Sequence, residues 1–188
     1  MYRALTWWFM AQGCDSADSG LIAERLTEPS IEVSTDPGHP WTRVNGRDVS
    51  AEIRTPEVSQ RVSAVARVPA VRERLIAQQR AVIGAAEPGI VAVGRDIGTV
   101  VARDAQLKVF LTADPGARAR RRAAELSADA GETEAAQARR DRLDAAQSEK
   151  AADALLVDAT EMTLEQVIGE ITRLARERSV LACAGDKS

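Results

Sequence analysis

Gly94-Arg95-Asp96-Ile97-Gly98-Thr99-Val100-Val101 is the stretch that decides the fold, because it directly follows the apolar run Gly89-Ile90-Val91-Ala92-Val93. The apolar run predicts a buried strand, so an arginine and an aspartate stand at its carboxyl end. Ligands of open α/β sheets bind at the carboxyl ends of the strands. This neighbouring donor and acceptor are suited to reading one edge of a nucleobase or to holding an anion. A local ion pair that closes a turn is the structural alternative.

Alternating strand and helix patterns extend outward from this stretch in both directions. We predict buried strands at residues 108–113 and 154–158, and helices at residues 2–12, 18–26, 117–126 and 135–143. Further helices open at Thr55-Pro56-Glu57 and at the capping-box pattern of residues 163–166, and Pro69 interrupts the first of them. The order predicts a three-layer α/β domain with a mostly parallel sheet.

A small antiparallel β element is predicted inside this α/β pattern. Residues 31–33 and 42–44 alternate in polarity, and Asn45-Gly46 is a strong signal for a two-residue hairpin.

Composition limits the classes of protein that remain. The 188 residues suit one domain, and 45% of them are hydrophobic, which is enough for a core. The net charge of -3 does not mark the protein as a whole as one that binds nucleic acid. Arginines cluster at residues 118–122 and 139–142, where they either attract phosphates or form a solvated helix face. Two distant cysteines, no signal peptide and no apolar segment of spanning length predict a cytoplasmic protein without membrane contact.

Several segments, in their order and spacing, resemble the bacterial cytidylate kinases, particularly those of actinobacteria. The segments are Met1-Tyr2-Arg3, residues 49–58, Val62-Ser63-Ala64-Val65, Val68-Pro69-Ala70-Val71-Arg72, residues 94–101 and residues 108–113. The resemblance covers nearly the whole chain. It implies a P-loop kinase-like parallel sheet in a single domain over residues 1–188, a monophosphate-binding part with the β insertion at 27–86, and a lid region at 127–150.

The resemblance also implies the activity, which is ATP-dependent phosphorylation of CMP or dCMP by a monomer, with Mg²⁺ accompanying ATP. It assigns CMP contacts to Arg3, Ser63, Arg72, Arg95, Asp96 and Asp144. It places Arg140 and Asp144 near the transferred phosphoryl group as catalytic residues, and Arg118, Arg121 and Arg122 on the ATP side. No protein ligand to a metal is implied by the residues present.

The chemistry of cytosine agrees with these roles. A carboxylate accepts from the cytosine N4 amino group, while a hydroxyl or guanidinium donates to N3. Uracil would set its O4 against the carboxylate, and two facing acceptors give strong discrimination. Guanidinium groups such as those of Arg3 and Arg72 match phosphate oxygens. The structural alternatives are an exposed helix-surface position for Ser63 and a surface ion pair for Arg72.

The chain departs from the family pattern at three places. No segment matches the glycine-rich phosphate loop that holds the β- and γ-phosphates, and the first strand that should precede it is also missing. Val93 stands where the family carries an acidic residue, and Gln147 stands where the lid arginine is expected. We therefore expect little or no turnover from residues 1–188, with three explanations left open: a misplaced start, a nucleotide-binding relative without catalysis, or a decayed fragment.

Overall fold

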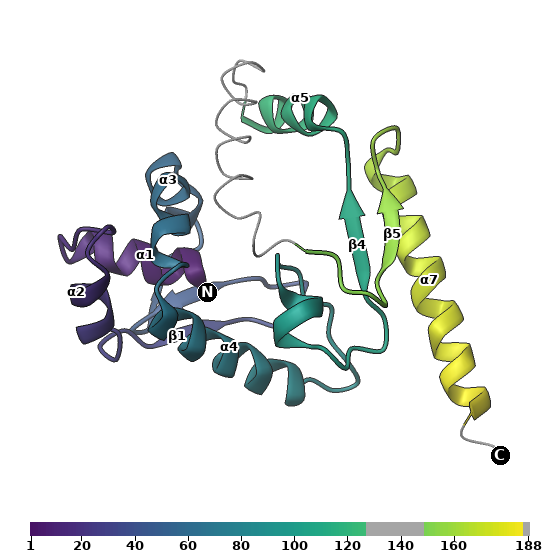
Figure 1. The fold of residues 1–188 in the computed structure, drawn as a ribbon, viewed down its shortest axis with the longest axis horizontal. Helices are drawn as coiled ribbons and strands as arrows, with labels where there is room; N and C mark the ends of the chain where they lie inside the picture. The colour runs from purple at the N-terminus through teal and green to yellow at the C-terminus, as the bar shows by residue number, and fades with distance from the viewer. Residues whose placement is uncertain (127–148, 186–188) are drawn as a thin grey trace. The chain divides into compact units, whose positions relative to one another are not determined.

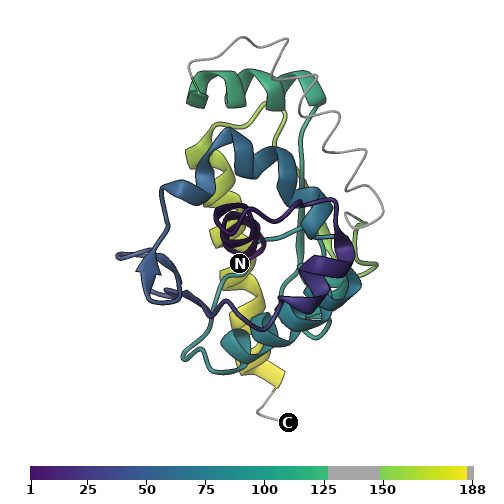
Figure 2. The same ribbon diagram turned by 90° about the vertical axis from the view of Figure 1, so that its left-hand side faces the viewer.

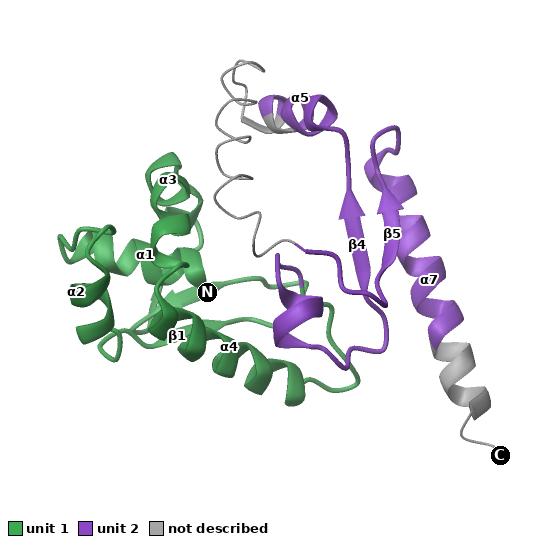
Figure 3. Ribbon diagram, in the orientation of Figure 1, with its two compact units in different colours: residues 1–92 green, residues 93–188 purple. Residues whose placement is uncertain are grey.

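The computed structural model describes residues 1–126 and 149–185, without the side chains of residues 122, 125, 126 and 179–185. The chain divides into two compact units, residues 1–92 and residues 93–188 (Figure 3). Each unit has secondary structure of its own. The prediction of a single domain over residues 1–188 stays a prediction.

The first helix, α1 (Tyr2–Ala11), supplies the centre of the core of unit 1 (Figure 1). Its apolar residues recur at helical spacing, and Leu5, Trp8 and Phe9 are buried. The Trp8 and Phe9 rings meet edge to face with centroids 5.1 Å apart, an arrangement that aromatic pairs prefer. Gly13 follows the helix with φ of 69°, a left-handed conformation that glycine adopts at no steric cost.

A second short helix, α2 (Ser19–Glu24), follows as predicted. The Asp18 carboxylate caps it by accepting a hydrogen bond from the Leu21 backbone N–H at 2.9 Å. Ile22 is fully buried in the same core as α1.

The predicted antiparallel element is present as a sheet of three short strands, β1 (Ile31–Val33), β2 (Thr42–Val44) and β3 (Arg47–Asp48). Ile31 lies opposite Val44, and both side chains are buried. Asn45 and Gly46 join β2 to β3 with φ of 50° and 79°. Two successive left-handed residues are the geometry of the tight hairpin that the Asn-Gly pair predicted.

Two further helices, α3 (Pro56–Val65) and α4 (Pro69–Gly84), complete unit 1. The 3₁₀ turn η1 (Glu52–Arg54) precedes them. Proline occupies the start of both helices, where its missing N–H and fixed φ are tolerated. Val71 and Leu75 of α4 are fully buried, and they join the core formed around α1.

Unit 2 contains η2 (Ile97–Val101), β4 (Val109–Thr112), α5 (Pro115–Leu126), β5 (Leu155–Asp158) and α7 (Leu164–Gly185). β4 and β5 run parallel and side by side (Figure 1; Figure 2 shows the same ribbon turned by 90°), with Val109 opposite Leu155 and Thr112 opposite Asp158. The predicted capping box opens α7: the Thr163 N–H donates to Gln166 Oε1 at 2.7 Å, and the Gln166 N–H donates to Thr163 Oγ1 at 3.3 Å. The helix predicted at 135–143 lies outside the described residues.

The buried strand predicted at residues 90–93 is wrong. These residues form no regular element, and Val91 and Val93 are 87% and 93% exposed. A strand is stable only beside a neighbour that bonds its backbone, and within the described residues the parallel sheet consists of β4 and β5 alone. An apolar, β-branched run without such a neighbour has no partner for its N–H and C=O groups and stays irregular.

The other two strands form where the sequence predicted them, but they are less buried than expected. Leu111 of β4 and Leu156 of β5 are 52% and 61% exposed, whereas Val157 is buried. Parallel strands are normally covered on both faces. Leu111 pairs with Val157, so Leu111 and Leu156 lie on opposite faces, and in the part of the chain that the structure describes each face of this small sheet carries an exposed leucine.

Hydropathy along the described helices also tests the prediction about membranes. None of the helices described here is both long enough and apolar enough to cross a bilayer.

Candidate nucleotide site

The aspartate of the Gly-Arg-Asp triplet lies at the start of η2 in unit 2. The Asp96 carbonyl accepts hydrogen bonds from the N–H groups of Val100 at 2.8 Å and Val101 at 3.2 Å, so η2 is a single π-helical turn. Such turns occur often at functional sites. The Asp96 residue is only 8% exposed, although carboxylates are rarely buried without a role or a partner. Arg95 beside it is exposed.

Close packing explains why glycine precedes this pair. A Cβ atom on Gly94 would lie 2.7 Å from Cγ1 of Ile97, which is closer than real Cβ contacts allow. The Ile97 side chain therefore lies across the backbone at residue 94. The absence of a side chain at this position lets the chain turn into η2 directly after Arg95 and Asp96.

Arg3 in unit 1 links three elements. Its Nη1 donates to the Ile53 carbonyl at 2.8 Å and to Ser59 Oγ at 3.0 Å, which joins α1 to η1 and α3. Ser63 lies four residues beyond Ser59, on the same side of α3. Ser63 is buried, so the alternative of an exposed helix-surface serine is wrong. The structure thus brings Arg3 to the helix face that carries Ser63.

Arg72 lies on α4, between the fully buried Val71 and the exposed Glu73, and is itself half-buried. Its backbone N–H donates to the Val68 carbonyl at 3.1 Å, within the first turn of the helix. The guanidinium therefore extends from the edge of the core of unit 1, near the start of α4.

The arginines of α5 differ in their surroundings. Arg121 Nη2 donates to the carbonyl oxygens of Ala159, Thr160 and Met162 at 2.6, 3.1 and 2.9 Å, so it holds the loop that follows β5. Arg118 is half-buried one turn earlier. The side chain of Arg122 lies outside the described residues. Residues 127–148 of the lid region predicted at 127–150 also lie outside them, and these include Arg140 and Asp144.

A polar clasp reinforces the loop beside Arg121. Thr160 Oγ1 accepts from the Asp114 N–H at 2.9 Å and donates to Asp158 Oδ1 at 2.6 Å. The Thr160 hydroxyl and the Thr160 backbone N–H both donate to Asp158 Oδ1, and these two hydrogen bonds lower the pKa of the Asp158 carboxyl. The clasp lies where β4 and β5 end, at the carboxyl edge where parallel sheets bind ligands.

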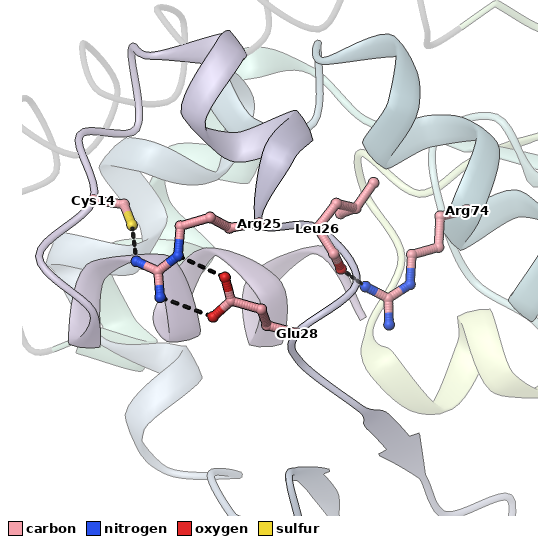
Figure 4. A network of polar contacts seen from close by, with 5 residues as sticks. All are labelled: Cys14, Arg25, Leu26, Glu28 and Arg74. Atoms are coloured by element: carbon pink, nitrogen blue, oxygen red, sulfur yellow. Dashed lines mark hydrogen bonds and ion pairs between the residues drawn. The ribbon is translucent and has the colours of Figure 1, made fainter.

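Sequence reasoning missed a second polar network, in unit 1. Arg25 forms a bidentate pair with Glu28, with both N–O distances 2.8 Å, and its Nη1 donates to Cys14 Sγ at 3.1 Å (Figure 4). The hydrogen bonds from Arg25 lower the pKa of the Glu28 carboxyl. The guanidinium also stacks on Trp8, 5.2 Å from the ring centroid.

Arg74 of α4 belongs to the same region and donates to the Leu26 carbonyl (Figure 4) and the Pro29 carbonyl. Partial burial lowers the pKa of its guanidinium. The Gln78 amide, one turn further along α4, donates to the Ile31 carbonyl. The spacing of Arg74 and Gln78 at i and i+4 was visible in the sequence, but their backbone partners nearly fifty residues away were not.

The described residues do not by themselves suit a metal ion. They contain no group of three or more His, Cys, Asp or Glu side chains arranged to hold one. Mg²⁺ in a phosphoryl-transfer site is held mainly by nucleotide phosphates and by a phosphate-loop hydroxyl.

Comparison with known proteins shows the family to which this chain belongs. A profile of the cytidylate kinase family matches residues 1–177. The chain belongs to the cytidylate kinase family.

Individual relatives agree with the profile. The chain is 47% identical over 182 residues to a cytidylate kinase of Streptomyces avermitilis, a match that covers 94% of this chain and 79% of the relative. It is 46% identical over 186 residues to a cytidylate kinase of Streptomyces griseus, covering 96% of this chain and 80% of the relative. It is also 41% identical to a bifunctional pantoate ligase/cytidylate kinase of Synechococcus elongatus, of which it spans 37%.

Proposed function

We propose that this chain binds CMP or dCMP for phosphorylation by ATP, yielding CDP or dCDP. The observation that carries the proposal is the buried Asp96 at the start of η2, in a chain of the cytidylate kinase family. The proposal includes a monomer acting in the cytoplasm. Two cysteines without metal spacing and a net charge of -3 support a reduced compartment and small-molecule partners.

Asp96 is proposed to read the cytosine base. A buried carboxylate accepts from the N4 amino group of cytosine, and in a low-dielectric site the hydrogen bond is stronger than in water. Arg95 and Ser63 are proposed to donate to the acceptor atoms of the same edge. Uracil would place a carbonyl oxygen against Asp96, which leaves two acceptors in contact and disfavours UMP.

Arg3 and Arg72 are proposed to bind the phosphate of CMP. The hydrogen bonds of Arg3 to Ile53 and Ser59 fix the position of its guanidinium before any ligand binds. A guanidinium that is already ordered loses less conformational entropy on binding. Arg72 contributes a second positive charge from α4, and guanidinium forks match phosphate oxygens in pairs.

The ATP side of the site is assigned to the arginines of α5, Arg118, Arg121 and Arg122. Arg140 and Asp144 are proposed to lie near the transferred phosphoryl group, with Asp144 also contacting the ribose of CMP. Phosphoryl transfer depends chiefly on positioning and on neutralising charge, and arginines supply both.

A second candidate function is binding of CMP without turnover. It is favoured by the lack of a phosphate-loop motif in residues 1–188 and by Gln147, whose neutral amide cannot stabilise a transferring phosphoryl group as an arginine does. Under this second candidate, the polypeptide of residues 1–188 by itself binds CMP and transfers little or no phosphoryl group.

Both candidate functions require that the polypeptide of residues 1–188 binds CMP, and calorimetry measures this binding directly. We expect CMP to bind and UMP to bind at least about tenfold more weakly, because one unpaired buried polar group costs about 1–3 kcal/mol. A coupled assay for ADP formation then measures turnover. Absence of CMP binding to a chain that melts cooperatively would contradict both candidates.

A further inference from the structure

We propose that Arg74 and Gln78 are positioning residues for the phosphate of CMP, because they fix the rotation of α4 and thereby the side on which Arg72 projects. The inference rests on the proposed role of Arg72. Arg74 and Gln78 themselves bond to backbone carbonyls of unit 1, the unit that also contains Arg72.

The two side chains hold one stretch of backbone. Arg74 donates to the carbonyls of Leu26 and Pro29, and Gln78 donates to the carbonyl of Ile31. All three acceptor residues are buried, so the stretch is fixed by the core as well as by α4. Bonds from a charged donor to a carbonyl are stronger than neutral ones, and together these contacts anchor one flank of the helix.

Helical geometry transmits this anchoring to Arg72. Successive residues of an α-helix are separated by about 100° around the axis. Val71 and Leu75 face the core; Arg74 and Gln78 lie on one flank of this apolar stripe, and Arg72 lies on the other. A helix held by its buried stripe and by one flank has little freedom to rotate, so the opposite flank is also fixed.

Apolar packing alone would leave this rotation less defined. Val71 and Leu75 are short side chains, and a stripe of aliphatic contacts tolerates small shifts of a helix along and around its axis. Directional hydrogen bonds from two turns of α4 to backbone remove that tolerance. A guanidinium meets phosphate oxygens with good geometry only within narrow limits of distance and angle, so a small rotation at Arg72 is costly.

A double-mutant cycle on CMP binding tests the inference. Dissociation constants for CMP and for cytidine are measured by calorimetry and NMR titration in the wild type, Arg72→Ala, Arg74→Ala and the double variant, below their melting temperatures. Arg74→Ala is expected to raise the dissociation constant of CMP by about tenfold and that of cytidine by less than about twofold, since only CMP carries the phosphate. In the double variant the loss should be no larger than in Arg72→Ala alone.

Two further variants keep the test decisive if Arg74→Ala fails to fold. Gln78→Ala removes one carbonyl contact and should show the same selective loss for CMP at smaller size. Arg74→Lys retains a positive donor and should restore part of the affinity. Arg80→Ala, on an exposed position of the same helix, serves as the matched control and should leave both constants unchanged.

Each outcome has a defined meaning. Additive losses in the cycle, or equal losses for CMP and cytidine, would overturn the positioning role and show that Arg74 serves stability alone. No loss of CMP affinity in Arg72→Ala would contradict the phosphate role proposed for Arg72, and the inference would fall with it. Coupled losses confined to CMP support the inference.

Discussion

The two units of the chain bury their apolar residues to different degrees. In unit 1, large side chains such as Leu5, Phe9, Ile22 and Leu75 are completely buried around α1. In unit 2, the buried residues are mainly small, such as Ala119 and Val157, and leucines of both strands remain exposed. The stability of a unit rises with the apolar area that it buries. The difference teaches that unit 1 has a core of large buried side chains, whereas the described residues of unit 2 leave leucines of both strands exposed.

The largest expected effect contrasts the two cores directly. Phe9→Ala in unit 1 should lower the free energy of unfolding by about 3–5 kcal/mol, because it removes a fully buried aromatic side chain and leaves a cavity. Leu156→Ala in β5 should cost less than about 1 kcal/mol, because that side chain is mostly exposed. Urea denaturation measures both. Equal costs would show that the face of β5 is covered in solution.

The glycine that precedes Arg95 and Asp96 in unit 2 provides the next test. Gly94→Ala inserts a Cβ against Ile97 and should lower the free energy of unfolding by about 1–3 kcal/mol, as overpacking does. The same substitution should displace Asp96 and lower the affinity for CMP. Gly84→Ala in unit 1 is the matched control, because a Cβ there meets no atom within 4 Å. Chemical denaturation and calorimetry give the two quantities. Tolerance of Gly94→Ala at full CMP affinity would contradict the assigned geometry of η2.

The hydrogen bonds that cap the start of α7 test whether polar contacts stabilise unit 2. Thr163→Ala removes the side-chain acceptor for the Gln166 N–H and should destabilise the protein by about 1 kcal/mol, the usual cost of losing a helix cap. Thr163→Ser keeps the hydroxyl and should behave as the wild type. Thermal melts followed by circular dichroism compare the three proteins. An Ala variant as stable as the Ser variant would mean that this helix end is already frayed.

The smallest expected effect is the pH dependence of the Arg25–Glu28 pair in unit 1. Arg25 lowers the pKa of Glu28 in the folded state, so the pair contributes stability above the unfolded pKa of about 4.3 and loses it as the pH falls through the folded value. Glu28→Gln should therefore flatten the acid limb of the stability curve. Unfolding free energies at several pH values below neutrality measure this slope. An unchanged slope would show that the pair does not persist in solution.

Local signals predicted the elements of unit 1 well, because each element depends on residues near it in the sequence. The Asn45-Gly46 hairpin, the prolines that start α3 and α4, and the apolar face of α1 all appear where the pattern placed them. The strand at residues 90–93 failed for the opposite reason, since a strand also needs a neighbour that no local pattern contains. The hydrogen bonds of Arg74 and Arg121 to backbone carbonyls could not be predicted either, because the acceptor residues lie far from these arginines in the sequence.

The candidate site was predictable in identity but only partly in geometry. The Gly-Arg-Asp triplet pointed to Asp96, and its burial agrees with a specific role. Ser63 proved to be buried rather than exposed, on the helix that Arg3 contacts. The roles of Arg140 and Asp144 stay predictions.

The preference for CMP over UMP in an Asp96→Asn variant tests the central claim most directly. An amide keeps the size of the carboxylate but also donates, so its N–H donates to uracil O4, and its oxygen accepts from the cytosine N4 amino group without the charge. We predict that the ratio of CMP to UMP affinity, measured by calorimetry, falls by at least about tenfold while the variant stays folded. An unchanged ratio would contradict the account, because Asp96 would then not contact the base.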